Sequence, residues 1–223
     1  MKTDTHKAYP LNRDLENPFG IQHDPINYYM PNYLSPKRMS SYGYQYKLAI
    51  ESAGNTFLNI GSANNILSDL LIRQHKYVIN LDLDVHTVPT VAATFPYIPF
   101  VPNAFDVVLC FQVLEHLPFN MLQISLTELK RLAGLIIISL PDITLTKREQ
   151  QKYEFFRTFH FPKEWKIYKP RYVDIEHFWE IGDGKVTLDQ IYSTFENANL
   201  SIIKDFRNDL GSSHHFFVLK NEK

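Results

Sequence analysis

Residues 55–84 have the sequence NTFLNIGSANNILSDLLIRQHKYVINLDLD, and this stretch decides the fold of the chain. It holds a short apolar run at 56–60, a turn that begins at Gly61, apolar residues at helical spacing, and a second apolar run at 77–83. A strand, a glycine turn, a helix and another strand form the opening of a βαβ unit, whose two strands lie parallel. We therefore predict an α/β protein.

The next segments continue the alternation of helices and buried strands. Four prolines between residues 85 and 104 disfavour the helix that usually joins the second and third strands, so we expect that helix to be reduced or missing. Apolar runs predict fully buried strands at 105–111 and 135–140, and the leucines between them predict a helix with Gly134 as its C-cap.

Helix and strand signals also occur toward both ends of the chain. The apolar spacing predicts an amphipathic helix at 36–52, and Thr187 with Gln190 forms a capping box ahead of a late helix. The chain closes with strands at 200–206 and 215–220. These are too near in sequence for a parallel crossover, so they must pair antiparallel or lie apart.

The length of 223 residues fits one domain with a modest insertion. We expect an irregular arm at 1–35 and a single domain at 36–223, which includes an aromatic and basic insertion at about 142–180. No apolar run approaches the ~18 residues of a membrane span, and no secretory apolar region is present. The lone Cys110 cannot form an intrachain disulfide, so a reducing, cytoplasmic location is expected.

The first candidate site is the turn NIGSANN at 59–65. A chain that leaves a parallel strand and enters a helix presents backbone N–H groups to a ligand. Asp82 follows at the end of the next strand, where a carboxylate can accept both hydroxyls of an adenosine ribose. A dinucleotide turn needs two further glycines, but Ala63 and Ile66 occupy those positions. NAD is therefore disfavoured, and a nucleoside without a pyrophosphate is preferred.

The order of these motifs resembles that of class I S-adenosylmethionine-dependent methyltransferases of the type-11 domain family. The resemblance covers residues 55–141, through LNIGSANN, INLDLD, IPFVPNAFDVVLCFQVLEHLP and LKRLAGLIIISLP, and the ending HHFFVLKN is similar to the family's last strand. It implies a Rossmann-like fold with a mostly parallel seven-stranded sheet, an antiparallel last strand and helices on both faces. It also implies S-adenosylmethionine as the cofactor.

The resemblance further implies a cofactor site along the glycine turn, the ribose acid, the adenine side and the end of the fourth strand. Its residues are Asn59, Gly61, Ser62, Ala63, Asp82, Leu83, Thr94, Phe95, Phe111 and Gln112. The chain departs from the family pattern in the turn, because Asn59 replaces an acid and Ala63 and Asn65 replace glycines. Asparagine tolerates a positive φ best among the non-glycine residues, so the turn can survive.

The second candidate site is the pair Glu115-His116. In the simplest interpretation Glu115 caps or pairs with the following helix, and His116 packs near the cofactor. Family members that methylate the terminal ribose of small RNAs carry E-x-x-E-H and a later histidine as metal ligands. By similarity the ligands would be Gln112, Glu115, His116 and His177, although the neutral Gln112 weakens a site for a hard cation. Alternatively, His116 or His177 is the general base for an acceptor hydroxyl.

Basic and aromatic residues alternate through the insertion, a composition that stacks on sugars or bases, although a helix with a buried aromatic face explains it equally. The net charge of −1 argues against a large nucleic-acid partner. We therefore predict a methyltransferase with a small or sugar-like acceptor. The alternatives are a metal-assisted RNA 2′-O-methyltransferase, a nicotinamide oxidoreductase, and a methyltransferase-like binding protein without activity.

Overall fold

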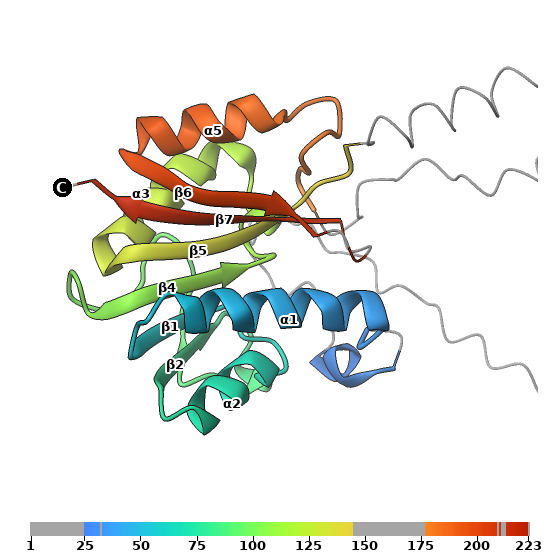
Figure 1. The fold of residues 1–223 in the computed structure, drawn as a ribbon, viewed down its shortest axis with the longest axis vertical. Coiled ribbons are helices and arrows are strands. Elements are labelled where there is room, and N and C mark those ends of the chain that lie inside the picture. The colour runs from blue at the N-terminus through green and yellow to red at the C-terminus, as the bar shows by residue number, and fades with distance from the viewer. Residues whose placement is uncertain (1–24, 32, 145–176, 209, 211–212, 223) are drawn as a thin grey trace, which may run out of the picture.

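The computed structural model describes residues 25–31, 33–144, 177–208, 210 and 213–222 (Figure 1). They form a seven-stranded sheet in the order β3-β2-β1-β4-β5-β7-β6. The strands are β1 (Thr56–Ile60), β2 (Tyr77–Asp82), β3 (Val91–Ala92), β4 (Phe105–Phe111), β5 (Ala133–Pro141), β6 (Leu200–Arg207) and β7 (His214–Asn221). The first five are mutually parallel, whereas β7 runs antiparallel to both β5 and β6. The predicted fold class is confirmed.

Helices cover both faces of the sheet because its central strands are apolar on both sides. On one face Phe57 packs with α1 (Pro36–Glu51) and α2 (Ile66–Arg73). On the other, Leu58 and Ile60 belong to a cluster with α3 (Leu122–Leu132) and α5 (Leu188–Asn197). Figure 1 shows α1 in front of the sheet, α3 behind it and α5 above β6.

Several local predictions are confirmed. Between β2 and β4 the chain forms only a short 3-10 turn, η2 (Val85–Thr87), and the two-residue strand β3 instead of a full helix. Both hydrogen bonds of the capping box between Thr187 and Gln190 are present at the start of α5. Further 3-10 turns are η1 (Pro25–Tyr29), η3 (Leu114–His116) and η4 (Phe119–Met121).

Two local predictions are wrong. Gly134 does not end α3, because the C-cap is Ala133, whose φ of −151° is already extended, and Gly134 lies inside β5. The chain therefore passes directly from helix to strand without the left-handed residue that a glycine cap supplies. The strand β4 is not fully buried either, since Asp106 is exposed and accepts hydrogen bonds from the N–H groups of Asn55 and Thr56.

Most of the predicted arm at 1–35, and residues 145–176 of the predicted insertion, lie outside the described residues. The basic and aromatic pattern of that insertion therefore stays a prediction. Among the helices that the structure describes, none has both the length and the apolarity to cross a bilayer.

A buried polar contact joins α1 to β7. The Ser41 hydroxyl lies 2.7 Å from Nδ1 of His214, and Nε2 of Gln45 donates to the same hydroxyl at 3.3 Å. Burial, followed by the positive charge of Arg38, lowers the pKa of His214 to about 3. The imidazole is therefore neutral in the folded protein at neutral pH, although it takes up a proton below about pH 6.5 in the unfolded chain.

This difference predicts acid sensitivity. Because the pKa of His214 is lower in the folded state, its contribution to stability is complete above about pH 6.5 and is lost as the pH falls toward 3. When the pH is lowered from about 7 to about 4.5, the free energy of unfolding of both proteins should fall. We expect it to fall by about 2–3 kcal/mol less in His214→Gln than in the wild type. Urea unfolding at both pH values measures this difference, and equal losses in the two proteins would contradict the prediction.

Candidate functional site

The turn between β1 and α2 requires glycine at its first position. The N–H of Gly61 donates to the carbonyl oxygen of Leu81 at 2.8 Å, and its φ of +69° lies in the left-handed region. A Cβ atom there would collide with the side chain of Val113, which follows β4. Glycine is therefore required at position 61 both by the backbone conformation and by the close approach of the loop after β4.

Two non-glycine residues of the same turn also adopt positive φ. The values are +47° for Ala63 and +60° for Asn65, the positions where the family has glycines. Asn65 is suited to this conformation, and its Nδ2 donates to the carbonyl oxygen of Thr87 at 3.2 Å. The turn thus keeps a glycine-type backbone with one glycine, at the cost of strain at Ala63.

Asp82 lies next to this turn, as the sequence predicted. One carboxylate oxygen accepts from the N–H of Ala63 at 3.1 Å, and the other accepts from the N–H of Asp84 at 3.0 Å. Burial raises the pKa of Asp82, and these two hydrogen bonds oppose the rise. The carboxylate at the end of β2 is therefore held against the turn.

Buried polar atoms without a hydrogen-bond partner among the described residues occur in and beside the turn. They are Oγ of Ser62, Oδ1 of Asn65 and Oδ2 of Asp84. An unsatisfied buried polar atom is costly, so a cluster of them indicates a place where a polar ligand completes the hydrogen bonding. The turn and Asp82 thus fit a nucleoside ligand.

The other predicted cofactor residues differ in their surroundings. Asn59 is buried on the α2 side, where its Nδ2 donates to Ser68 and Asn80. Phe111 packs against Phe216 in the core on the α1 side. Gln112 has a φ of +56° and donates from Nε2 to the hydroxyl of Ser139 at 3.2 Å.

On the expected adenine side, Phe95 is buried in the core and Leu83 is exposed, while Thr94 forms an isolated bridge with Tyr97. No described contact tests the roles assigned to these three residues, which stay predictions.

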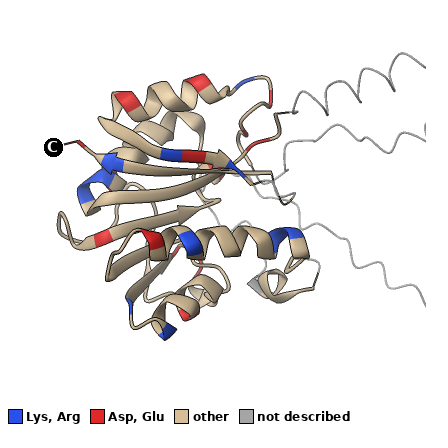
Figure 2. Ribbon diagram, in the orientation of Figure 1, with Lys and Arg blue, Asp and Glu red and all other residues tan. Residues whose placement is uncertain are grey.

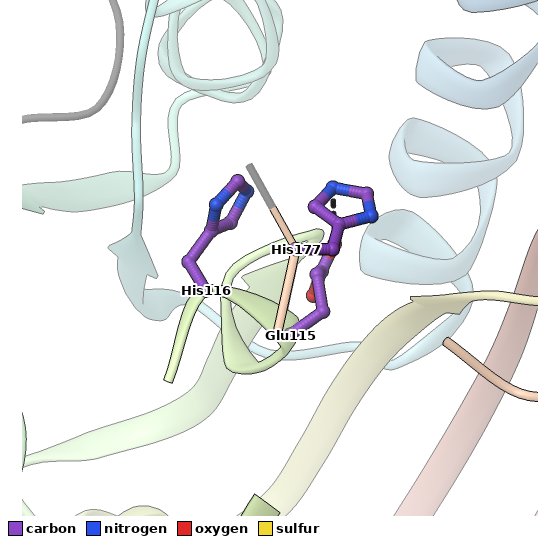
Figure 3. Close-up of side chains that lie close together, drawn as sticks. All are labelled: Glu115, His116 and His177. Carbon is purple, nitrogen blue, oxygen red and sulfur yellow. Dashed lines mark ion pairs between the residues drawn. The ribbon is translucent and has the colours of Figure 1, made fainter. Parts of the chain in front are cut away.

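The second predicted site does come together in space. The donor atoms of Glu115, His116 and His177 all lie within 4.8 Å of one another. Figure 3 shows the two imidazole rings side by side, with Glu115 reaching toward His177. The N–H of Phe178 donates to the carbonyl oxygen of Glu115, and the indole of Trp179 donates to Leu117, so the backbone holds His177 over η3.

Glu115 is fully buried, and neither of its carboxylate oxygens has a hydrogen-bond partner among the described residues. Burial raises its pKa to about 7, although the nearby His177 opposes the shift. His177 is also bound by Glu180, whose Oε1 lies 2.6 Å from Nδ1, while Nε2 lies 4.0 Å from Glu115. The ring is therefore oriented with Nδ1 toward Glu180 and Nε2 toward Glu115.

The structure brings further residues to the site that the sequence did not single out. The Tyr42 hydroxyl donates to Oδ1 of Asn64 in the turn at 3.1 Å, and burial raises the pKa of Tyr42. Arg38 lies one helical turn before Tyr42, and Glu180 contacts His177. The available signals were polar residues at helical spacing in α1 and the H-x-x-E spacing of His177 and Glu180.

The strain in the turn can be measured. Replacing Ala63 by glycine relieves a left-handed backbone, so we expect Ala63→Gly to stabilise the protein by about 1 kcal/mol. Gly61→Ala should destabilise it by at least about 2 kcal/mol, because the new Cβ meets Val113. Gly43→Ala in α1 is the matched control, because the new Cβ would meet open space. This substitution should raise the free energy of unfolding by about 0.5–1 kcal/mol. Urea unfolding tests all three, and a destabilised Ala63→Gly would refute the strain argument.

The fold and the glycine turn agree with comparisons to known proteins. Residues 58–134 match the model of the methyltransferase domain family, whereas no curated protein sequence matches the chain.

Among solved structures, magnesium protoporphyrin IX methyltransferase (ChlM) from Synechocystis PCC 6803, with bound SAH, is similar at a TM-score of 0.61 and 13% identity, over 93% of each chain. The N-methyltransferase NodS from Bradyrhizobium japonicum WM9, in complex with S-adenosyl-L-homocysteine, has a TM-score of 0.57 at 12% identity, over 85% of this chain and 89% of its own. The methyltransferase domain of a bacterial Hen1 has a TM-score of 0.57 at 14% identity, over 82% of this chain and 99% of its own. Residues 58–134 of this chain therefore match the methyltransferase domain family, within a fold that the chain shares with class I methyltransferases.

Proposed function

We propose that the chain is an S-adenosylmethionine-dependent methyltransferase. The observation that carries this proposal is the hydrogen bond between the Asp82 carboxylate and the N–H of Ala63, which joins the ribose acid to the glycine turn. The family match and the bound demethylated cofactor in two structural neighbours support the same assignment.

The turn and its neighbours would hold the cofactor. Ser62 supplies a buried hydroxyl without a described partner beside the methionine moiety, and Asp82 accepts the ribose hydroxyls. When bound, the cofactor supplies an activated methyl group on a sulfonium. The protein's own task is to align acceptor, methyl and sulfur and to exclude water, which is catalysis by proximity and orientation. Asn59 has a supporting role in this proposal, because its amide nitrogen already binds Ser68 and Asn80.

The proposed acceptor is small or sugar-like and carries a hydroxyl. His177 is the preferred general base, because Glu180 fixes the orientation of its ring. His116 is the neighbouring alternative, since the centroids of the two imidazole rings lie 4.8 Å apart. A proton taken from the acceptor would reside on Nε2 of His177 while Nδ1 remains bound to Glu180.

Cofactor binding is the test of this proposal. Titration calorimetry with S-adenosylhomocysteine should give saturable binding with a stoichiometry of about one. Asp82→Ala should weaken that binding on the order of 10- to 100-fold, because it removes hydrogen bonds to a charged acceptor. Asp189→Ala, a carboxylate lost from the exposed side of α5, is the control that should bind as the wild type does. A wild-type protein that binds neither this ligand nor S-adenosylmethionine would exclude the enzyme.

A metal-assisted methyltransferase is the second candidate, and the gathering of Glu115, His116 and His177 favours it. Two imidazoles and one carboxylate suit an intermediate or soft divalent ion such as Mn²⁺ or Zn²⁺ better than Mg²⁺. The side-chain amide of Gln112 binds Ser139, and no described contact joins it to the three residues. A small-RNA methyltransferase HEN1 is among the structures with this fold, at 14% identity, which makes a ribose hydroxyl the acceptor to test first.

Metal binding is measured independently of activity. We expect Mn²⁺ to bind with a stoichiometry of about one and to raise the unfolding temperature, since a ligand that binds only the folded state stabilises it. Glu115→Gln and His177→Gln should each weaken the binding at least about tenfold, because each removes one ligand. His75→Gln, at an exposed histidine in the turn that follows α2, should leave it unchanged. Binding that survives both ligand substitutions would contradict this candidate.

A further inference from the structure

The first turn of α1 lies over the edge of the sheet where the parallel strands end. Figure 1 shows α1 running antiparallel to β4 and β5, so that its N-terminal end is next to their carboxyl ends. Figure 2 shows that this end of the helix is basic. Ligands of open α/β sheets bind at this edge, where the glycine turn and Asp82 also lie.

One face of α1 is anchored to the functional edge by side-chain contacts. Ser41 binds His214 at the start of β7, and Tyr42 donates to Asn64 in the glycine turn. Arg38 precedes these residues by three and four positions, so it shares their face of the helix and lies about 6 Å from Tyr42 along the axis. The anchored face therefore directs Arg38 to the same edge.

Contacts of Arg38 hold its guanidinium in place. The guanidinium carbon lies 4.5 Å from the centre of the Tyr33 ring, and the residue is half-buried. Tyr33 in turn meets the ring of Tyr28 edge-on at 5.3 Å, and the carbonyl oxygen of Tyr28 accepts from Nδ2 of Asn64 at 3.0 Å. Arg38 is thus linked to the turn through the Tyr28–Tyr33 pair.

The charge of Arg38 has no ion-pair partner among the described residues. The positive charge of Arg38 nevertheless acts on a nearby residue. After burial, it is the second cause of the lowered pKa of His214. A stacked guanidinium is a rigid fork of N–H donors, which matches the two oxygens of a carboxylate. Partial burial strengthens such a pair, because there is less water to screen it.

We propose that Arg38 binds the carboxylate of the cofactor's methionine moiety. This inference rests on the proposed function and adds a binding residue that lies outside the family's glycine turn. The methionine moiety is the preferred source of the carboxylate because Tyr42, one helical turn from Arg38, and Tyr28, whose ring meets that of Tyr33, both bind Asn64, which follows Ser62 and Ala63 in the turn. An anionic group on the acceptor is the competing source.

A four-way binding comparison separates these sources. S-adenosylhomocysteine and its decarboxylated form, which keeps the adenosine, the thioether and the amine, are titrated into the wild type and into Arg38→Gln. The wild type should bind the carboxylated ligand on the order of 10- to 100-fold more tightly. In Arg38→Gln this preference should fall to less than about threefold, because the substitution and the decarboxylation remove the same contact.

Two further variants complete the design. Arg38→Lys should retain part of the preference, since it keeps the charge but loses the fork, and Arg73→Gln at the exposed end of α2 should retain all of it. Thermal unfolding of each variant verifies that the binding comparison is made on folded protein. An unchanged preference in Arg38→Gln would overturn the role of Arg38 while leaving the methyltransferase assignment intact. A wild type that binds neither ligand would overturn the proposed function, and this inference with it.

Discussion

The close packing of Gly61 against Val113 is the constraint around which the candidate site residues of this protein are arranged. The backbone of Gly61 is held on one side by the carbonyl oxygen of Leu81 and on the other by the loop after β4. Because no Cβ fits between them, three neighbouring strands end at the same place. Asp82 at the end of β2 and Glu115 in η3 lie at the same edge of the sheet as this contact.

Polar groups at this edge are held by the protein but are not all satisfied by it. Ser62, Asn65, Asp84 and Glu115 each contain a buried oxygen without a hydrogen-bond partner among the described residues. Among the other described residues only Oγ of Ser125 and Oδ1 of Asn221 are in the same state, whereas groups such as Ser41 and His214 are paired. An unsatisfied buried group in a native structure calls for an explanation, and several of them gathered in one place are explained by a polar ligand that completes their hydrogen bonding. The gathering of these atoms at the carboxyl edge agrees with the family match and with the fold.

The fold was largely predictable from the sequence because it depends on patterns of local periodicity. Buried strands and the helices between them produce apolar runs and helical spacing that any parallel sheet requires. The prediction failed at Gly134, where a glycine after a helix suggested a cap, although the chain continues directly into β5. That outcome depends on the pairing of β5 with β4 and β7, which the local sequence does not reveal. The glycine turn was predicted, but only the structure gives positive φ at Ala63 as well as Asn65.

By itself, the sequence determined the order of elements, the glycine turn with Asp82, and the candidate status of Glu115, His116 and His177. Contacts between segments distant in the chain decided the rest. His177 is 62 residues from Glu115, and Arg38 belongs to a helix that precedes the first strand. The position of neither residue in space therefore follows from spacing along the chain. Only the packing of α1 against β7 and the turn, and the backbone bonds between residues 178 and 115, bring these charges to one edge. The physical reason is that periodicity specifies which face of an element is buried, whereas the partner of a polar side chain on that face is set by tertiary packing.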